Sequence, residues 1–170
     1  MTGLITIETE RLLLRRHRVE DFEAVAAMWR DREVARHIGG APSSREEVWA
    51  RLLRYAGHWA MMGFGFYAIE EKETGRFVGE TGFAYFHRDL GRAFDDAPEI
   101  GWVLAHWAHG QGYATEAVSA VVDDAGWGRS VCMITPDNKP SRRVAAKCGY
   151  TEFGRAIYKG NTVLLYDRYG

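Results

Sequence analysis

In the first half of the chain, hydrophobic and polar residues alternate in some stretches and recur every three or four positions in others. Alternation indicates a strand and the longer period indicates a helix. On this basis we predict a strand within 4–17 and a helix over 18–31 with one apolar face. The stretch "HIGGAPSS" predicts a loop, and Ser43 or Ser44 is expected to cap a second helix starting at about residue 45.

From residue 64 onward the apolar runs are shorter and more aromatic. Two runs flank "KETG", which is typical of a hairpin turn, and a polar loop over 87–98 follows them. The remaining expected elements are a strand at 99–105, a helix after the glycines at 110 and 112, a short strand at 130–135, a short helix ending at Gly149 and a terminal hairpin turning at "KGN".

The order of these elements predicts the fold class. Helices and strands alternate only in part, which favours an α/β or α+β domain with a mixed central sheet. With 170 residues, of which 46% are hydrophobic, the chain is long enough for one compact core, so we expect a single domain over 1–170.

Charge and cysteine content narrow the function classes. The net charge of −1 gives no overall basic field for nucleic acid or an anionic membrane, so we expect neither partner. The two cysteines, Cys132 and Cys148, suit a reducing, cytoplasmic protein better than a disulfide framework. No apolar stretch is long enough for a membrane span, and the start of the chain lacks the apolar core of a leader sequence.

The stretch "HGQGYATEA", residues 109–117, carries the first functional signal. It places two glycines where a helix should begin, and the first amides of a helix have no partner inside it. Such a turn binds anions, typically phosphates. A P-loop would need Gly-Lys followed by Ser or Thr, and a dinucleotide site would need a third glycine at Thr115, so neither alternative fits well.

A second motif, "NKPSRRVAAKCGY" at 138–150, follows the turn by about 25 residues. Together with "EIGWVLAHWAHGQGYATEA" and the opening "IETERLLLRRHRVEDFEAV", it resembles the GNAT superfamily of acetyl-CoA-dependent N-acetyltransferases. Within that superfamily the chain is most similar to ribosomal-protein N-terminal acetyltransferases acting on alanine or serine. The resemblance covers nearly the whole chain. It implies a mostly antiparallel sheet of about seven strands, about four helices, and a V-shaped split between the fourth and fifth strands.

The resemblance also implies where acetyl-CoA binds. The family turn, Gln/Arg-x-x-Gly-x-Gly/Ala, falls on His109, Gly112 and Ala114, and His109 departs from the usual first residue. Glu116 is expected to point away from the phosphates. An amide of Val103 or Leu104 would stabilise the oxyanion of the tetrahedral intermediate. The expected cofactor-binding set is Trp102, Val103, Leu104, His109, Gly110, Gln111, Gly112, Tyr113, Ala114, Thr115, Asn138 and Ser141.

Acetyl transfer to an amine requires that the amine lose a proton and that the leaving thiolate gain one. Glu99, at the start of the strand that carries the proposed oxyanion donor, is our candidate base, and Glu80 is the second candidate. The alternative role of Glu99 is a solvated acid at a strand end. Ser141 or Tyr150 could protonate the thiolate, although packing is the more natural role for Tyr150. Ser141 could instead bond backbone groups at the start of its helix.

Several points stay open at this level. The acidic loop 87–98 would attract a cationic amine, but a protein N-terminus and a small amine are both compatible with it. A monomer and a homodimer are equally compatible. A non-catalytic acyl-CoA sensor is the alternative function, and His109 is the motif departure that suggests it. His106 and His109 could bind a metal only on a helix, so we expect no metal site.

Overall fold

The structure, a computed structural model, describes residues 6–170, and its core is one mixed sheet. The strand order across the sheet is β1-β2-β3-β4-β5-β6-β8-β7, and every neighbouring pair is antiparallel except β5 and β6. The strands are β1 (Thr6–Glu8), β2 (Leu12–Arg16), β3 (Phe66–Glu71), β4 (Phe77–Ala84), β5 (Glu99–Leu104), β6 (Arg129–Ile134), β7 (Thr151–Tyr158) and β8 (Asn161–Tyr169).

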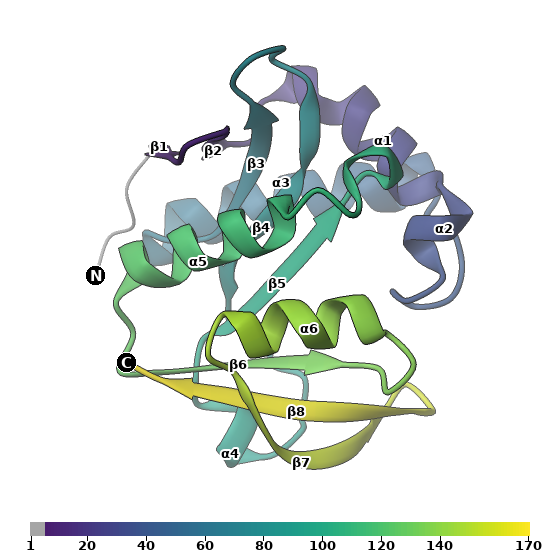
Figure 1. The fold of residues 1–170 in the computed structure, drawn as a ribbon. Helices are drawn as coiled ribbons and strands as arrows, with labels where there is room; N and C mark the ends of the chain where they lie inside the picture. Colours follow the sequence, from purple (N-terminus) through teal and green to yellow (C-terminus); the bar gives the residue numbers. More distant parts are fainter. Residues whose placement is uncertain (1–5) are drawn as a thin grey trace.

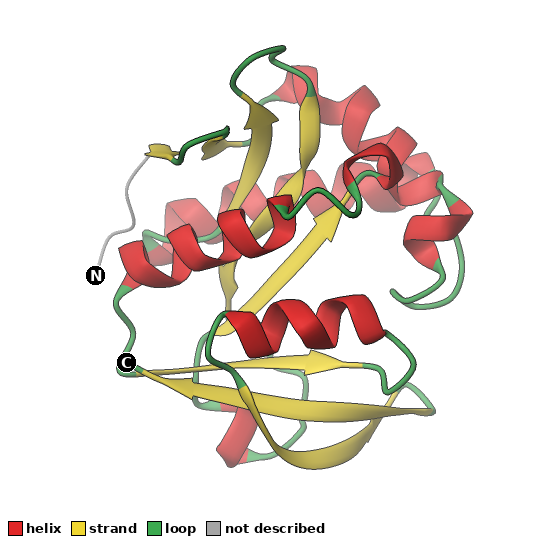
Figure 2. Ribbon diagram, in the orientation of Figure 1, coloured by secondary structure: helices red, strands yellow, loops and turns green. Residues whose placement is uncertain are grey.

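Helices cover both faces of the sheet. In Figures 1 and 2, α5 and α6 lie in front of it, and α1 and α3 lie behind it. The helices are α1 (Phe22–Arg30), α2 (Arg32–Ala35), α3 (Arg45–Met62), α4 (Arg92–Asp95), α5 (Tyr113–Ala125) and α6 (Lys139–Lys147), with 3-10 turns η1 (Val19–Asp21) and η2 (His106–Ala108). The expected α+β fold is confirmed.

The strand count differs from the expectation by one. The stretch predicted as a single strand is the hairpin β1–β2, and positions 4 and 5, with which that strand was expected to begin, lie outside the described residues. The hairpin turns where the Thr9 amide donates to the Leu12 carbonyl at 2.9 Å. No glycine or proline marks this turn in the sequence. The short helices α2 and α4 were also not predicted, and α4 lies inside the expected polar loop.

The predicted helix and hairpin ends are otherwise confirmed. Ser44 caps α3, and its side chain and that of Glu47 bond each other's backbone amides. "KETG" connects β3 to β4, and Lys159 and Gly160 connect β7 to β8.

The expected split lies between β5 and β6, the strands counted as fourth and fifth in the prediction. Their pairing is confined to Glu99 and Val131, where the Val131 amide donates to the Pro98 carbonyl at 3.0 Å. From there β5 stays paired with β4, and β6 stays paired with β8. The two strands therefore diverge like the arms of a V, as Figure 1 shows.

Side chains of β5 alternate between two packed faces. Ile100 and Leu104 belong to the main core, which includes α5, whereas Val103 packs with residues of α1 and α3. Glu99 and Gly101 share the face of Val103, since successive side chains point to opposite sides of a strand. The split is thus flanked by a core on each side of the sheet.

Glu80 joins the α1 and α3 face to the sheet. It is fully buried on β4, and its Oε1 accepts hydrogen bonds from Trp29 Nε1 at 2.9 Å and from the Tyr55 hydroxyl at 2.8 Å. His17 Nε2 lies 3.1 Å from the other oxygen. Burial alone would raise the pKa of Glu80, but the contacts with His17, Tyr55 and Trp29 lower it below its usual value. One carboxylate therefore fixes both helices to the sheet.

We predict that Glu80→Gln lowers the free energy of unfolding by about 1.5 to 3 kcal/mol at pH 7, because hydrogen bonds to a buried charged group are lost. A lowered carboxyl pKa adds stability above the unfolded-state pKa, and that stability is lost as the pH falls. The difference between wild type and variant should therefore shrink below about pH 4.5. Urea unfolding at pH 7 and pH 4 measures it, with exposed Glu73→Gln as control. Equal stabilities at pH 7 would contradict this role.

Candidate active site at the split between two strands

The backbone of β5 presents one edge to the split. The Ala105 amide donates to the Val78 carbonyl at 2.8 Å, which directs the backbone groups of odd-numbered residues toward β4. In an antiparallel pair these directions alternate. The amides of Trp102 and Leu104 therefore face the split, and the amide of Val103 faces β4. Of the two expected oxyanion donors, only Leu104 points the right way, because pairing with β4 occupies the backbone of Val103.

The glycine turn follows β5 after the 3-10 turn η2. Gly110 and Gly112 have φ values of 75° and 81°, which favour glycine. Gly112 is the residue before α5, and the first intrahelical bond runs from the Glu116 amide to the Gly112 carbonyl at 3.1 Å. The amides of the three residues 113–115 precede that bond, so they can bind an anion at the positive end of the helix dipole.

Two side chains of the turn bond back to the chain. His109 Nε2 lies 2.9 Å from the Leu104 carbonyl, and Gln111 Nε2 donates to the Trp107 carbonyl at 3.0 Å. A carbonyl oxygen can only accept a hydrogen bond, so Nε2 of His109 is the donor and carries a proton. His109 thus joins the glycine turn to the end of β5. Histidine stands here in place of the Gln or Arg of the family turn, and it still supplies a hydrogen-bond donor.

Glu116 points away from the turn, as expected. Its Oε1 accepts from the Thr9 hydroxyl at 2.6 Å, and its Oε2 accepts from Arg11 Nε at 2.7 Å. Arg11 Nη1 also donates to the Gln111 carbonyl at 2.9 Å. The β1–β2 turn therefore holds both the first turn of α5 and the glycine turn. Sequence reasoning missed Arg11, because about 100 positions separate it from both partners.

The helix α6 lies across the split from α5 (Figure 1). Asn138 precedes it, is buried, and accepts the Ser141 amide through Oδ1 at 3.2 Å. The backbone amide of Ser141 is therefore capped. Tyr150 lies elsewhere: its hydroxyl is 2.7 Å from Ser130 Oγ in the core, where burial raises its pKa. This supports the packing role for Tyr150.

The two candidate bases differ in their surroundings. Glu99 is 6% exposed, and its two oxygens accept from Arg88 Nε at 2.6 Å and Nη2 at 2.9 Å. Burial raises the pKa of Glu99 above its usual value, although Arg88 acts in the opposite direction. Glu80 lies on the same sheet face, as expected, but it is fully enclosed by its three partners. Glu99 is thus the better placed of the two.

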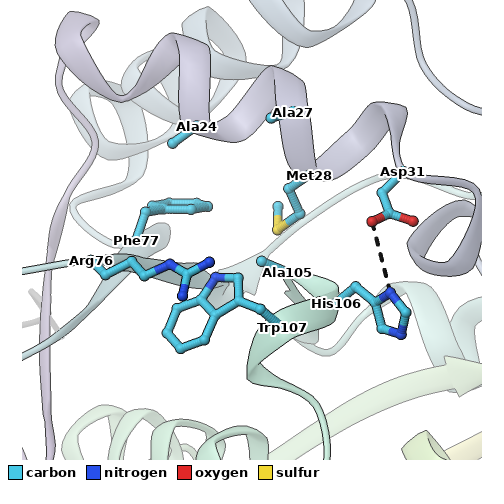
Figure 3. Close-up of a pocket in the computed structure, with 9 residues that line it drawn as sticks. All are labelled: Ala24, Ala27, Met28, Asp31, Arg76, Phe77, Ala105, His106 and Trp107. Carbon is cyan, nitrogen blue, oxygen red and sulfur yellow. Dashed lines mark ion pairs between the residues drawn. The ribbon is translucent and has the colours of Figure 1, made fainter.

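A pocket of about 600 Å³ adjoins the segment that connects β5 to the glycine turn. Figure 3 shows the apolar side chains of Met28, Phe77 and Ala105 between two pairs of interacting side chains. In one pair the Arg76 guanidinium lies 3.8 Å from the ring centre of Trp107, and in the other His106 Nδ1 lies 4.0 Å from Asp31. The full lining is Ala24, Ala27, Met28, Asp31, Arg76, Phe77, Ala105, His106 and Trp107.

The described residues contain neither a metal-binding cluster nor a membrane-spanning helix. Within 6–170 no group of three or more His, Cys, Asp or Glu side chains is arranged to hold a metal ion. His106 and His109 lie close, with ring centres 5.4 Å apart, on a 3-10 turn and the residue after it. No helix in this part of the chain is long and apolar enough to cross a membrane.

Comparison with known proteins decides the family. Residues 11–151 match the model of the acetyltransferase (GNAT) domain. The chain belongs to the GNAT acetyltransferase family. The N-acetyltransferase p20 of Bacillus licheniformis is 28% identical over 156 residues, covering 88% of this chain and 84% of that protein. A GNAT-family acetyltransferase structure from Bordetella pertussis is 31% identical with a TM-score of 0.85, covering 96% of this chain and 98% of that one.

More distant GNAT structures share the fold alone. A ribosomal L7/L12 alpha-N-protein acetyltransferase in complex with coenzyme A is 18% identical, has a TM-score of 0.78 and covers 96% of this chain and 97% of its own. Spermidine N-acetyltransferase from Vibrio cholerae, in complex with CoA and spermine, is 16% identical, has a TM-score of 0.73 and covers 95% of this chain and 96% of its own. Both of these structures are complexes with coenzyme A.

Family membership and fold make this protein an acetyl-CoA-dependent N-acetyltransferase. The prediction of a transferase is confirmed, and the non-catalytic sensor is the weaker alternative. The P-loop and dinucleotide alternatives also lose their support, because the glycine turn belongs to a GNAT domain.

We predict that Ala114→Glu abolishes coenzyme A binding while the fold is retained, because a carboxylate beside the amides of residues 113–115 would repel the pyrophosphate. Calorimetry with coenzyme A measures this. The matched control is Ala146→Glu, on the exposed side of α6. Gly112→Glu should also lose binding, but any side chain at its φ of 81° strains the backbone, so Ala114 gives the clearer result. Unchanged affinity in both variants would contradict the phosphate site.

We also predict that His109→Ala lowers kcat on the order of tenfold, less than the roughly 10²–10³ lost with a direct oxyanion donor. Loss of the bond to the Leu104 carbonyl would let the neighbouring amide move. His109→Gln, which restores the family residue and a donor, should recover most of the rate. Steady-state kinetics decide this, with His106→Ala as control. Equal kcat in His109→Ala and wild type would remove the role given to this bond.

Proposed function

We propose that this enzyme transfers the acetyl group of acetyl-CoA to a primary amine by direct attack, with the cofactor bound in the split between β5 and β6. The observation that carries the proposal is that these strands part after Glu99 and leave one edge of β5 free, and that the glycine turn follows the far end of that strand. The pantetheine arm would pair with the free edge of β5 at Trp102 and Leu104, and the pyrophosphate would bind the amides over 110–115. Asn138 and Ser141 would contact the arm from the α6 side.

In the proposed reaction the amine nitrogen forms a bond to the thioester carbonyl carbon, and the carbon–sulfur bond then breaks. The developing oxyanion would accept a hydrogen bond from the Leu104 amide, which faces the split. Glu99 lies five residues before Leu104 on β5, roughly 16 Å along the strand, so it would take the amine proton through a chain of waters. Ser141 would supply or relay a proton to the coenzyme A thiolate. Glu99 begins β5, Leu104 ends it, and Ser141 lies in α6.

For the acceptor we infer an N-terminal α-amine in preference to a polyamine. An α-amine has a pKa near 7.7 to 8.0, so a useful fraction is neutral at pH 7, whereas alkyl amines are almost fully charged. Arg88 neutralises the charge of Glu99, which weakens the attraction of this site for a polycation. The similarity to ribosomal-protein acetyltransferases supports a protein acceptor.

Acceptor choice can be measured with a panel of amines. Peptides starting with alanine, serine or methionine would be compared with spermidine and with peptides acetylated in advance at the N-terminus. Thiol release from acetyl-CoA gives the rate, and mass spectrometry locates the acetyl group. We expect transfer to at least one free N-terminus. Transfer to spermidine alone would contradict the α-amine inference but retain the amine acetyltransferase.

We predict that Glu99→Gln lowers kcat by about 10²-fold or more, the usual contribution of a positioned base, with coenzyme A affinity nearly unchanged. The acidic limb of the pH profile should flatten. Amines that are charged at the assay pH should lose more rate than weakly basic amines, which arrive neutral. Glu73→Gln is the surface control. Near-normal turnover from pH 6 to pH 9 would leave Glu99 as a structural acid.

A further inference from the structure

Arg88 lies in the loop after β4, between two residues with unusual backbone conformations. His87 and Asp89 have φ values of 50° and 60°, in the left-handed region that residues other than glycine seldom adopt. Such conformations persist only where surrounding contacts hold them, and they are frequent at functional sites.

The guanidinium of Arg88 is fixed from three directions. Two of its nitrogens bond the two oxygens of Glu99, and Nη1 donates to the Tyr158 hydroxyl at 2.9 Å. Its central carbon lies 4.4 Å from the ring centre of Phe86 and 5.1 Å from that of Tyr158. The side chains of Arg88 and Glu99 are 19% and 8% exposed. This is a largely desolvated, two-point ion pair, a geometry that arginine makes and lysine does not.

The ion pair leaves Glu99 chemically competent. An ionised carboxylate has about four lone-pair positions, and the guanidinium uses one on each oxygen. The remaining positions can still receive a proton from an amine or a bridging water. The Arg88 guanidinium therefore orients Glu99 and leaves lone pairs of the carboxylate free to accept a proton.

Burial opposes the ionised form of this carboxyl. Desolvation raises the pKa of Glu99, and the nearby Asp95 of α4 acts in the same direction. Cys132 of β6 is coupled to Glu99 but stays a neutral thiol, since burial raises its own pKa far above the usual value. Tyr158 of β7 contributes a hydroxyl through Arg88. Against these groups Arg88 supplies a positive charge, and its own pKa is raised, so it stays charged.

We propose that Arg88 is a positioning residue that holds Glu99 in its ionised form, so that the buried carboxylate can accept a proton at neutral pH. The inference rests on the proposed role of Glu99 as base. It adds a residue that no motif of the sequence indicates and that acts on the reaction only through its partner.

The test is the pH dependence of kcat/KM for acetyl transfer to a peptide amine in wild type and Arg88→Met. An opposite charge at hydrogen-bond distance lowers a carboxyl pKa by roughly 1 to 3 units, so the acidic limb should move up by about that amount in the variant. The maximal rate at high pH should fall much less. Arg92→Met, which removes an exposed arginine of α4, is the matched control and should leave the limb in place.

The double variant Glu99→Gln with Arg88→Met keeps the inference testable if Arg88→Met alone fails to fold, because it leaves no unpaired buried charge. It should show the same rate and the same flat acidic limb as Glu99→Gln. A further loss beyond about threefold would show that Arg88 acts independently, and would overturn the inference. An unshifted limb in Arg88→Met would overturn it too. An acidic limb that survives in Glu99→Gln would instead contradict the base itself, which separates the two claims.

Discussion

The site depends on backbone groups of β5 that, within residues 6–170, have no hydrogen-bond partner in a neighbouring strand. β5 is an interior strand, yet beyond Glu99 its edge toward β6 has no strand partner in the described chain. Backbone amides and carbonyls that are shielded from bulk water need hydrogen-bond partners. A ligand with its own amides, such as the pantetheine arm, can complete that edge in the manner of an added strand. In the proposed mechanism, the parting of β5 and β6 provides both the cofactor site and the geometry of the oxyanion donor.

Side-chain contacts hold the free edge of β5 and the glycine turn in place. His109 satisfies the last carbonyl of β5, while Arg11 and Thr9 hold the first turn of α5 through Glu116. On the other face, Glu80 fixes α1 and α3 to the sheet. The glycine turn and the sheet beside the split are thereby held by charged or polar contacts, of which those of Glu80 are buried. This arrangement suits a reaction in which one amide must lie close to a developing charge.

The sequence predicted those parts of the fold that depend on local pattern. Hydrophobic periodicity located most strands and helices, and glycines with positive φ marked the turn before α5. The β1–β2 turn was missed because its residues carry no turn signal and it is stabilised by Thr9. The alternation that excludes the Val103 amide depends on register with β4, which single-strand patterns do not define. The partners of Glu80 and Glu99 come from other elements, so their roles could be distinguished only in three dimensions.

Amide hydrogen exchange, resolved by residue with and without coenzyme A, tests the central claim most directly. If the cofactor completes the free edge of β5, the amides of Trp102 and Leu104 should gain protection when it binds. The amide of Val103, already directed at β4, should change little. Unchanged exchange at Trp102 and Leu104 under saturating coenzyme A would contradict the claim that the split between β5 and β6 is the cofactor site.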